Sequence, residues 1–443
     1  ALMAGRKKQP ELTAEEKLQQ ALVPEAEQPY KVPDNWCWVR LKILSDFERG
    51  ITFPASAKEK IANESNIPCI RTANIQEELE IDDLIYVDKK YMKENENKLI
   101  RVNDIIMSSA NSRELVGKVS YVNYVSEPMT FGGFVIVIRS QYIFSKFLFY
   151  FLRLEFLFGH FMGKSTQTTN IANINTANLG NYAFPLPPLA EQQRIVERIE
   201  TLFAKLDEAK EKLQNTLDIF EIRKAAILHK AFTGELTANW RKQHDLTLDS
   251  WKEKTLKSLS DKIGDGLHGT PNYTDNGDYA FINGNNFAGD KIEIKPETKK
   301  VDFNEYMKYK VELNDKTVFV SINGTLGKTA FYNNENIILG KSACYINVNQ
   351  NLNKDFVNYA NEKATGSTIK NLGLKAMRNL KINLPTLDEQ TEIVRIIDNL
   401  LAKEQKAYSI AQNAIAQIDL IKKSILARAF RGQLATNNPA DES

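Results

Sequence analysis

Two long stretches of the chain place mostly apolar side chains at alternating steps of four and three residues. In the first stretch these positions are Ile195, Ile199, Leu202, Leu206, Ala209, Leu213, Thr216 and Phe220. In the second they are Ile393, Ile397, Leu400, Glu404, Ala407, Ala411, Ala414 and Ile418. This heptad spacing puts one stripe along one face of a helix. It predicts two long helices, from near 190 to 230 and from near 388 to 428.

The two stretches belong to an internal repeat. The segment 186–236 aligns with 384–434 without a gap, and about 21 of the 51 positions are identical. The strongest matches are Leu-Pro-Pro-Leu-Ala-Glu-Gln at 186–192 with Leu-Pro-Thr-Leu-Asp-Glu-Gln at 384–390, and Ala-Phe-x-Gly-x-Leu at 231–236 and 429–434. Weaker echoes pair Trp36 with Trp251, and the segment 68–75 with 279–287. The whole chain therefore reads as a duplicated unit, a variable part followed by a repeated part.

The repeated helices are expected to pack on each other. A single amphipathic helix is usually a core helix of its own domain, and that alternative stays open for either copy alone. Two copies in register, with bulky residues in one where the other has small ones, favour a helix pair. Gly234 and Gly432 follow the last periodic residues and suit helix ends. The predicted interface consists of Ile199, Leu202, Leu206, Leu213, Phe220, Ile397, Leu400, Ala411 and Ile418.

The segments between the repeats have a different pattern. Short apolar runs at 134–138, 317–322 and 337–339 are separated by Gly, Asn, Asp and Pro, which predicts mixed sheet-and-helix globules with long loops. The apolar stretch 142–161 is interrupted by charged residues and is expected to be a buried helix. Thr13 and Glu16 have the spacing of a capping box that opens a short helix. We divide the chain into a helical segment 1–30, a globule 31–188, a helix 189–245, a globule 246–386 and a helix 387–443.

Composition narrows the class of protein. Of 443 residues, 42% are apolar and 26% charged, as in globular proteins, and the net charge of +2 neither requires nor excludes nucleic acid. No apolar run reaches the roughly 18 residues of a membrane span, and the first residues lack the apolar core of a secretion signal. We therefore expect a cytoplasmic protein. The three scattered cysteines, Cys37, Cys69 and Cys344, predict reduced thiols rather than disulfides or a metal site.

Several motifs resemble catalytic sites but fail on spacing or context. Gly264 to Gly269 matches the dinucleotide fingerprint, yet Thr-Pro-Asn follows where that motif needs a helix, so a loop rich in turns is expected. The Gly-Lys-Thr at 327–329 lacks the first glycine of a phosphate loop, because Ile322 stands there. Asp290, Glu293 and Lys295 are the residue types of a metal nuclease, although such triplets are common on polar strands. We expect no catalytic, cofactor or metal site on this chain.

The polar loops of the two globules carry residue types that read base edges and bind phosphates. For any single residue a solvated loop is the ordinary interpretation. The first globule offers Asn74, Ser108, Asn111, Arg113, Lys118, Lys164, Thr166, Gln167 and Thr168. The second offers His268, Thr270, Asn272, Tyr273, Asn283, Asn285, Asn286, Asn323, Thr325, Lys328, Lys341 and Lys370.

The pattern resembles the specificity subunit of type I restriction-modification systems over nearly the whole chain. The motif at 185–193, its echo at 384–390 and the two Ala-Phe-x-Gly-x-Leu helix ends are its strongest marks. Segments 263–271 and 281–287 resemble phrases of the target-recognition domains of that family, whereas 70–75 departs from them.

The resemblance implies an α+β fold. Two mixed α/β target-recognition domains would be joined by two long antiparallel coiled-coil helices in a pseudo-two-fold repeat. Within that pair, Ile199, Leu202 and Leu213 are predicted to face Ile397, Leu400 and Ala411. The partners implied are double-stranded DNA, methyltransferase subunits, expected to be two, and a restriction or motor subunit. S-adenosylmethionine, ATP and Mg²⁺ are expected only on those partners.

The resemblance leads to one hypothesis and leaves two alternatives. The chain is interpreted as a non-catalytic subunit that reads an asymmetric bipartite DNA site. A self-contained restriction nuclease or methyltransferase is the first alternative, and the absence of an Asn-Pro-Pro-Tyr-type motif and the poor acidic triplet count against it. A coiled-coil scaffold without DNA is the second, and it leaves two different loop-rich domains unexplained.

Overall fold

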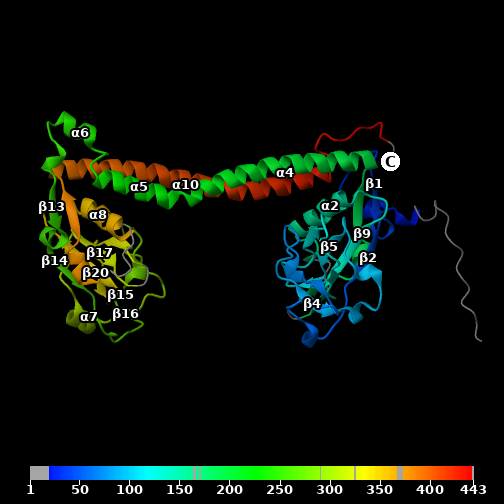
Figure 1. Ribbon diagram of the computed structural model, residues 1–443, viewed down its shortest axis with the longest axis horizontal. Helices are drawn as coiled ribbons and strands as arrows, with labels where there is room; N and C mark the ends of the chain where they lie inside the picture. Colours follow the sequence, from blue (N-terminus) through cyan, green and yellow to red (C-terminus); the bar gives the residue numbers. More distant parts are fainter. Residues whose placement is uncertain are drawn as a thin grey trace, which may run out of the picture. The chain divides into compact units, whose positions relative to one another are not determined.

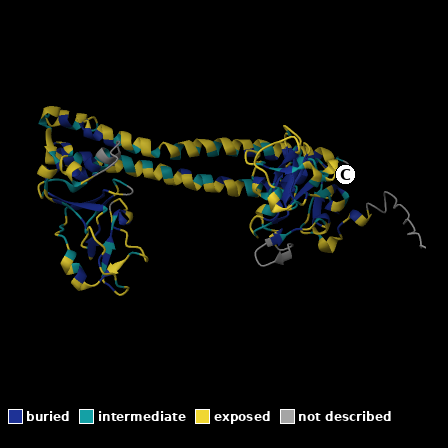
Figure 2. Ribbon diagram, turned by 60° about the horizontal axis from the view of Figure 1, so that its bottom comes forward, coloured by how far each residue is buried: buried dark blue, intermediate teal, exposed yellow. Residues whose placement is uncertain are grey.

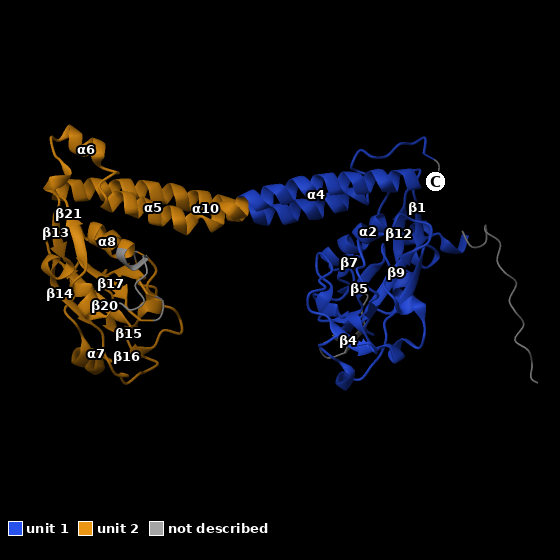
Figure 3. Cartoon of the chain, viewed as in Figure 1, with its two compact units in different colours: residues 1–212, 414–443 blue, residues 213–413 orange. Residues whose placement is uncertain are grey.

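A computed structural model describes residues 19–162, 166–168, 171–289, 291–323, 326–366 and 373–441. The chain divides into two compact units, residues 1–212 with 414–443 and residues 213–413 (Figure 3). Each unit therefore combines one globule with parts of both long helices, which differs from a division at the helix ends. The capping-box residues Thr13 and Glu16 lie outside the described residues.

The first unit contains a central antiparallel sheet and three smaller sheets. The central sheet has the order β2 (Ser45–Arg49), β9 (Val135–Ser140), β5 (Ile105–Ser108), β7 (Val119–Tyr121). A second sheet has the order β4 (Ile85–Asp88), β3 (Asn66–Ile70), β8 (Thr130–Phe131), with β3 and β8 parallel. The others are β10 (Thr166–Thr168), β11 (Ile171–Asn173), β6 (Ala110–Asn111), and the pair β1 (Cys37–Arg40), β12 (Ala183–Leu186).

The second unit repeats this topology. Its central sheet has the order β14 (Ser260–Asp265), β20 (Ala343–Val348), β17 (Thr317–Ser321), β18 (Thr329–Phe331). A second sheet has the order β16 (Lys300–Val301), β15 (Tyr279–Ile282), β19 (Ile337–Leu339), and β15 and β19 are parallel like β3 and β8. The pair β13 (Lys252–Thr255), β21 (Lys381–Leu384) matches β1 and β12. The duplication predicted from the sequence is thus present in the fold.

One helix in each globule packs on the central sheet. These are α2 (Ser145–Leu157) and α8 (Lys354–Gly366). Phe147, Leu148 and Leu152 of α2 are fully buried, which confirms the buried helix expected at 142–161. Buried residues gather inside both globules (Figure 2). The shorter α-helices are α3 (Thr176–Gly180), α6 (Ala238–Gln243), α7 (Phe303–Tyr309) and α9 (Leu374–Arg378).

Single 3₁₀ turns connect the other elements. They are η1 (Glu25–Glu27), η2 (Leu41–Ile43), η3 (Ala55–Ala57), η4 (Thr72–Asn74), η5 (Lys89–Met92), η6 (Glu96–Lys98), η8 (Leu248–Ser250), η9 (Leu256–Leu259) and η10 (Gly284–Asn286). The turns η4 and η10 follow equivalent strands of the two units, so the short connections are duplicated along with the sheets.

The first predicted long helix is two helices in the structure. Helix α4 (Leu189–Asp218) and helix α5 (Phe220–Phe232) are separated at Ile219, whereas the second repeat forms one helix, α10 (Leu387–Ala429). The break follows Thr216, a weaker helix former than the Ala414 at the equivalent position of α10. Both ends agree with the prediction, since Gly234 and Gly432 adopt left-handed φ values of 80° and 69° just after the helices.

The long helices run antiparallel within each unit (Figure 1). In the first unit, Lys210 pairs with Asp419 at 3.1 Å, and Asp207 pairs with Lys422. In the second unit, Arg223 lies 3.3 Å from Glu404, and the rings of Phe220 and Tyr408 are 4.8 Å apart. Residues later in one helix meet residues earlier in the other, which confirms the antiparallel prediction.

The expected pairing along the helices is wrong in register. Ile199 belongs to the same buried cluster as Leu426, Ala429 and Phe430. Ile397 belongs instead to a cluster with Leu228, Ala231 and Phe232. Antiparallel packing opposes the start of one repeat to the end of the other, so Ile199 and Ile397, both near the starts, do not face each other.

The remaining sequence predictions concern membrane spans and the cysteines. No helix in the described part of the chain is long and apolar enough to cross a membrane. The thiols of Cys69 and Cys344 are buried, and burial raises the pKa of each to about 12, so both stay protonated.

Candidate nucleic-acid interface

Strands β3 and β15 each end in a tight turn held by a buried asparagine. Asn74 Oδ1 accepts from the Arg71 N–H at 2.9 Å, and its Nδ2 donates to the Asp83 carbonyl at 3.1 Å. Asn286 makes the same bonds, with the Asn283 N–H at 3.0 Å and the Glu293 carbonyl at 3.0 Å. Their exposures are 3% and 7%. Asn74 and Asn286 therefore shape their turns and do not present free amides to DNA, which corrects their prediction as base-reading residues.

The residues beside Asn74 and Asn286 in these turns are more accessible to solvent. Asn283 is half-buried and its Oδ1 accepts from the Asn285 N–H at 2.9 Å, while the Asn285 side chain is exposed. In the first unit, Arg71 is half-buried and its guanidinium bonds Asp83 at 3.1 Å. The two turns therefore share a backbone and differ in the side chains that they present.

The connection from β5 to β7 is equivalent to the one from β17 to β18. In both, the last residue of the first strand is a buried serine, and the Gly117 and Gly327 N–H groups donate to the Ser108 and Ser321 carbonyls at 2.8 and 3.0 Å. Ser108 is fully buried and its hydroxyl accepts from Asn111 at 3.2 Å, so its prediction as a DNA contact is corrected.

The remaining predicted residues of these connections lie closer to solvent. Arg113, Asn323 and Lys328 are exposed, and Asn111 and Lys118 are half-buried. The Lys118 ammonium donates to the Gln76 side chain, which brings this connection to the turn after β3. In the second unit, a Cβ added at Gly284 would stand 2.6 Å from the Ser321 Cβ, so the same two segments touch.

A third segment joins this cluster in the first unit. Strand β11 pairs with β6 in the register Ala172 with Asn111, so the β10–β11 hairpin lies beside the β5–β7 connection. Thr166, Gln167 and Thr168 form β10, and their side chains are outside the description. Lys164, Thr325 and Lys370 lie outside the described residues.

The segment after β14 carries four exposed candidates of the second unit. His268, Thr270, Asn272 and Tyr273 are exposed, and His268 Nε2 lies 2.5 Å from Asp265 Oδ2. The Leu267 N–H donates to the Leu339 carbonyl at 2.7 Å, and the Asn323 N–H to the Ser342 carbonyl at 3.4 Å. These bonds place the segment beside exposed Lys341 and Asn323. The predicted loop begins later than expected, since Gly264 and Asp265 still belong to β14.

Gly266 is required by close approach of two backbones. A Cβ at this position would lie 2.2 Å from the Leu339 carbonyl oxygen, and one at Gly50 in the first unit would lie 2.1 Å from the Gly132 carbonyl oxygen. Real Cβ atoms do not come this close, so both positions need glycine. Gly266 of the fingerprint-like segment is therefore required by the packing of strands.

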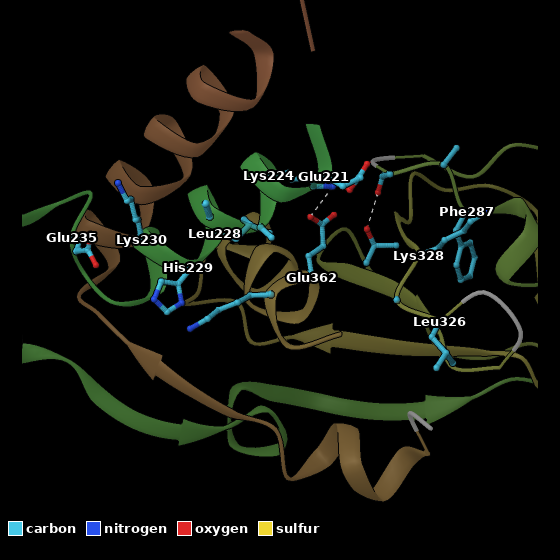
Figure 4. Close-up of a pocket in the computed structure, with 17 residues that line it drawn as sticks. Glu221, Lys224, Leu228, His229, Lys230, Glu235, Phe287, Leu326, Lys328 and Glu362 are labelled. Atoms are coloured by element: carbon cyan, nitrogen blue, oxygen red, sulfur yellow. Dashed lines mark hydrogen bonds and ion pairs between the residues drawn. The ribbon is translucent and has the colours of Figure 1, made fainter. Parts of the chain in front are cut away.

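A cleft of about 1040 Å³ lies in the second unit between α5, α8 and the loops. Figure 4 shows Lys224 and His229 of α5 on one side, and Leu326, Lys328 and Phe287 on the other. Lys224 pairs with Glu362 at 3.3 Å, and burial lowers the pKa of Lys363. Its described lining carries more lysines than glutamates, which suits a phosphate backbone.

The equivalent cleft of the first unit has the opposite charge. It has a volume of about 920 Å³ and is lined by α2, α4 and the segment 76–82. Six acidic residues, Glu77, Glu78, Glu80, Asp82, Glu200 and Asp207, face three basic ones, Lys146, Arg153 and Lys422. A phosphate backbone is therefore disfavoured in the first cleft and less so in the second, whose described lining has four lysines and three glutamates.

The repeated Glu-Gln motif anchors each globule to its helix. Glu191 Oε2 accepts from the Trp36 indole at 2.8 Å, and Glu389 Oε2 from the Trp251 indole at 2.9 Å. Gln192 Oε1 accepts from the Phe144 N–H at 2.9 Å, and Gln390 Oε1 from the Asn353 N–H at 3.2 Å, at the starts of α2 and α8. These side chains were not among the predicted site residues, although the repeated motif and the paired tryptophans were visible in the sequence.

The predicted helix-pair residues are all at least partly covered. Ile199, Ile397, Ala411 and Ile418 are buried. Half-buried residues are Leu202, Leu206, Leu213, Phe220 and Leu400. Among the nuclease-like residues, Asp290 lies outside the described part, and Glu293 and Lys295 are exposed and 3.9 Å apart. Within the described residues no three His, Cys, Asp or Glu side chains are grouped to hold a metal.

Comparison with known proteins decides the family. The profile of the type I restriction modification DNA specificity domain matches residues 33–219 and 249–412. The chain belongs to this family. The prediction made from the repeated motif is therefore confirmed.

Individual relatives of this family match along most of the chain. The type I restriction enzyme EcoKI specificity subunit of Escherichia coli K12 is 26% identical, covering 91% of this chain and 90% of its own. The StySPI specificity subunit of Salmonella potsdam is 27% identical with the same coverage. Both are named as specificity subunits, in agreement with the expectation that this family member is not itself an enzyme.

Solved structures share the fold. A chain from a type I restriction-modification system, solved for its assembly and conformational transition, aligns with a TM-score of 0.68 at 20% identity. The HsdS subunit of Thermoanaerobacter tengcongensis aligns with a TM-score of 0.58 at 19% identity. Each match covers 92% of this chain and all of the other, which confirms the predicted fold class.

Proposed function

We propose that this specificity chain reads an asymmetric, two-part DNA site, one half with the loops of each unit. The observation that carries the proposal is the duplicated loop cluster with different side chains. Equivalent turns present Arg71 in one unit and Asn283 with Asn285 in the other, and equivalent connections present Arg113 and Lys328. Matched frames with unmatched polar residues suit two half-sites of different sequence.

The two halves would be separated by an unread spacer. Helix α10 has 43 residues, 387–413 in the second unit and 414–429 in the first. At 1.5 Å per residue it is about 65 Å long, more than one DNA turn of about 34 Å. We therefore expect the spacer length to follow the number of helical residues between the globules.

Methylome mapping tests this reading. Cells would express the system with the natural chain, with residues 31–188 exchanged for those of a relative, or with one heptad removed from both helices. The exchange should alter one half-site only, and the heptad deletion should shorten the spacer while both halves persist. A continuous site, or a spacer that ignores helix length, contradicts the proposal.

The methyltransferase subunits are proposed to dock on the helices, with two copies expected. Several apolar side chains there remain in solvent, among them Ile222 at 68%, Ile410 at 57% and Leu420 at 58% exposure. We take these side chains as anchors of a partner contact, since contiguous exposed apolar patches mark interaction sites. Replacing Ile222 or Ile410 with Lys should abolish co-purification with the methyltransferase subunit, while Glu221→Lys serves as a polar control. Unchanged co-purification would place the docking surface elsewhere.

Chemistry is proposed to lie on the partners. The restriction subunit would cut, and S-adenosylmethionine, ATP and Mg²⁺ would bind to the partner subunits, with the whole assembly acting on DNA in the cytoplasm. The purified chain should therefore neither methylate nor cleave DNA. Nuclease activity that Glu293→Ala abolishes would overturn this part.

A further inference from the structure

The first unit contains a cavity of about 750 Å³ that no DNA-reading loop lines. Its walls come from the segment before β1, from β1 and β12, and from the ends of α2 and α10. Five aromatic rings dominate them, those of Tyr30, Trp38, Phe151, Phe158 and Tyr182. The Tyr30 and Trp38 rings meet edge to face with centroids 4.8 Å apart. Such a cavity has the size and apolar walls of a small-molecule site.

A buried carboxylate faces into this cavity. The Glu155 side chain is 10% exposed, and its Oε2 accepts from the Tyr182 hydroxyl and lies 2.9 Å from His160 Nδ1. Its Oε1 bonds to none of the described residues, yet it is not sealed from solvent. Burial and the Glu155 charge raise the pKa of Tyr182, so its hydroxyl keeps the proton that it donates. One oxygen of a nearly buried carboxylate is thus left for a donor from outside.

Two cations lie over rings that line the cavity, and one of them, Arg431, is itself part of the lining. The Arg431 guanidinium lies over the Tyr30 ring at 5.3 Å, and the Lys423 ammonium over the Phe158 ring at 4.3 Å. Neither has an acidic partner among the described residues. Because each cation covers one face of its ring, a further cation is disfavoured there, and an anionic group is favoured at the rim.

The second unit lacks this arrangement. Trp38 pairs with Pro185 in the first unit, and Glu253 pairs with Asn383 at the same register in the second, so Glu253 stands where the first unit has Trp38. The Leu41 N–H donates to the Tyr182 carbonyl and the Leu256 N–H to the Leu380 carbonyl, so Leu380 takes the place of Tyr182. The repeat likewise places Thr233 where the first unit has Arg431. The cavity is therefore not part of the duplicated scaffold, and its aromatic and charged lining is not needed to build the fold.

We propose that this cavity binds a nucleotide, with the base between the aromatic rings, a base N–H on Glu155 Oε1 and the phosphate near Arg431. Bases offer flat π faces and amino donors, which match the rings and the free carboxylate oxygen. The phosphate matches the two unpaired cations. The nucleotide could come from solution or from the end of a nucleic-acid strand, which have the same chemistry. The proposal is independent of which bases the loops read.

Calorimetric titration of the full chain with AMP, GMP, CMP and UMP tests the site. At least one should bind with a Kd below about 1 mM, and Glu155→Gln and Arg431→Gln should each weaken it at least ~10-fold. The control Arg395→Gln removes an exposed cation of α10 in the second unit and should leave the Kd unchanged. A short single-stranded oligonucleotide that competes assigns the ligand to a strand end, and one that does not assigns it to the free nucleotide.

Two results would overturn the proposal. One is the absence of binding by all four nucleotides up to about 10 mM, far weaker than typical cellular ligands. The other is binding that neither variant changes. Glu155→Gln also alters the bonds to Tyr182 and His160, so its thermal unfolding is measured alongside. Arg431 is exposed, and Arg431→Gln therefore keeps the test valid if the first variant is unstable.

Discussion

The indole nitrogen of Trp251 donates to a buried oxygen of Glu389 at 2.9 Å, joining the start of a globule to the start of the helix that follows it. The other oxygen of Glu389 accepts from Arg241 at 2.6 Å and from Thr237 at 2.8 Å. Glu191 occupies the same place in the first unit and bonds Trp36 and Asn437, both neutral. The equivalent glutamates therefore differ in their partners. Glu389 forms an ion pair, whereas Glu191 accepts hydrogen bonds from the neutral side chains of Trp36 and Asn437.

This difference predicts unequal effects of two equivalent substitutions. Glu389→Ala leaves the buried Arg241 charge unpaired and should lower the free energy of unfolding by about 3–5 kcal/mol. Glu191→Ala strands only neutral donors and should cost about 1–3 kcal/mol. Urea unfolding of the full chain measures both, with exposed Glu253→Ala as a near-silent control. Equal losses at the two sites would contradict the account.

Helix α8 contains a buried amide that the fold does not satisfy. Asn361 is fully buried, and neither its Oδ1 nor its Nδ2 has a hydrogen-bond partner among the residues that the structure describes. When α2 and α8 are aligned on their fully buried residues Phe147 and Phe356, the position equivalent to Asn361 is Leu152 in α2. Asn361→Leu should raise stability by about 1–3 kcal/mol, because an unsatisfied buried polar group is removed. Thermal unfolding decides it, with Asn399→Leu on the exposed face of α10 as control; a lower midpoint for Asn361→Leu would count against the idea.

The C-terminal tail belongs to the first unit and helps to hold its start. Asn437 donates to Asn35 at 2.8 Å and to Glu191 at 2.9 Å, and Arg194 donates to the Thr436 carbonyl at 3.0 Å. A chain that ends at Leu434 loses these bonds and should unfold at a lower temperature. A chain that ends at Asp441 keeps them and should match the natural protein. Identical unfolding of the two truncations would mean that the tail contributes nothing.

The C-terminal tail gives the two repeats a cyclic relation. In the second unit, the segment after α5 supplies Thr237 and Arg241 to Glu389; in the first, the segment after α10 supplies Asn437 to Glu191. Asn437 also bonds Asn35, so the tail lies beside the start of the first globule. A permutant that joins Ser443 to Ala1 and opens near Gln243 should therefore fold and bind DNA.

The repeat made the architecture predictable from the sequence. Heptad spacing located both helices, and short apolar runs located strands such as 317–321 and 337–339. The helix break at Ile219 was not predictable, because no Gly or Pro marks it. The helix register was predicted wrongly, since periodicity gives a face but not the partner that it meets.

Site residues were harder to predict than elements. Asn74, Ser108 and Asn286 are of residue types that read DNA bases. Their polar groups, however, make hydrogen bonds inside the fold, to the backbone or to a neighbouring side chain. Asn285 and Lys328 are also of types that bind DNA, and their side chains are exposed. Residue type alone does not separate the two groups, because turns and base edges require the same amides and hydroxyls.

The last prediction separates base reading from phosphate binding in the second unit. Asn285 is exposed at the tip of its turn, and an amide there can pair with a base edge. Asn285→Ala should relax specificity at one position of one half-site and cost about 1–3 kcal/mol on the natural sequence only. Lys328 is exposed and lines the cleft between α5 and α8. Lys328→Ala should weaken binding to all sequences alike and reduce the salt slope by about one charge.

Fluorescence anisotropy of the chain with its methyltransferase subunits measures both effects on natural and single-base-substituted duplexes at several salt concentrations. Lys257→Ala, an exposed lysine of η9, is the matched control and should change neither quantity. Asn286→Ala should instead lower thermal stability, since its amide holds the turn. If Asn285→Ala weakens every duplex equally, or if Lys328→Ala alters base preference, the assignment of these two side chains is wrong.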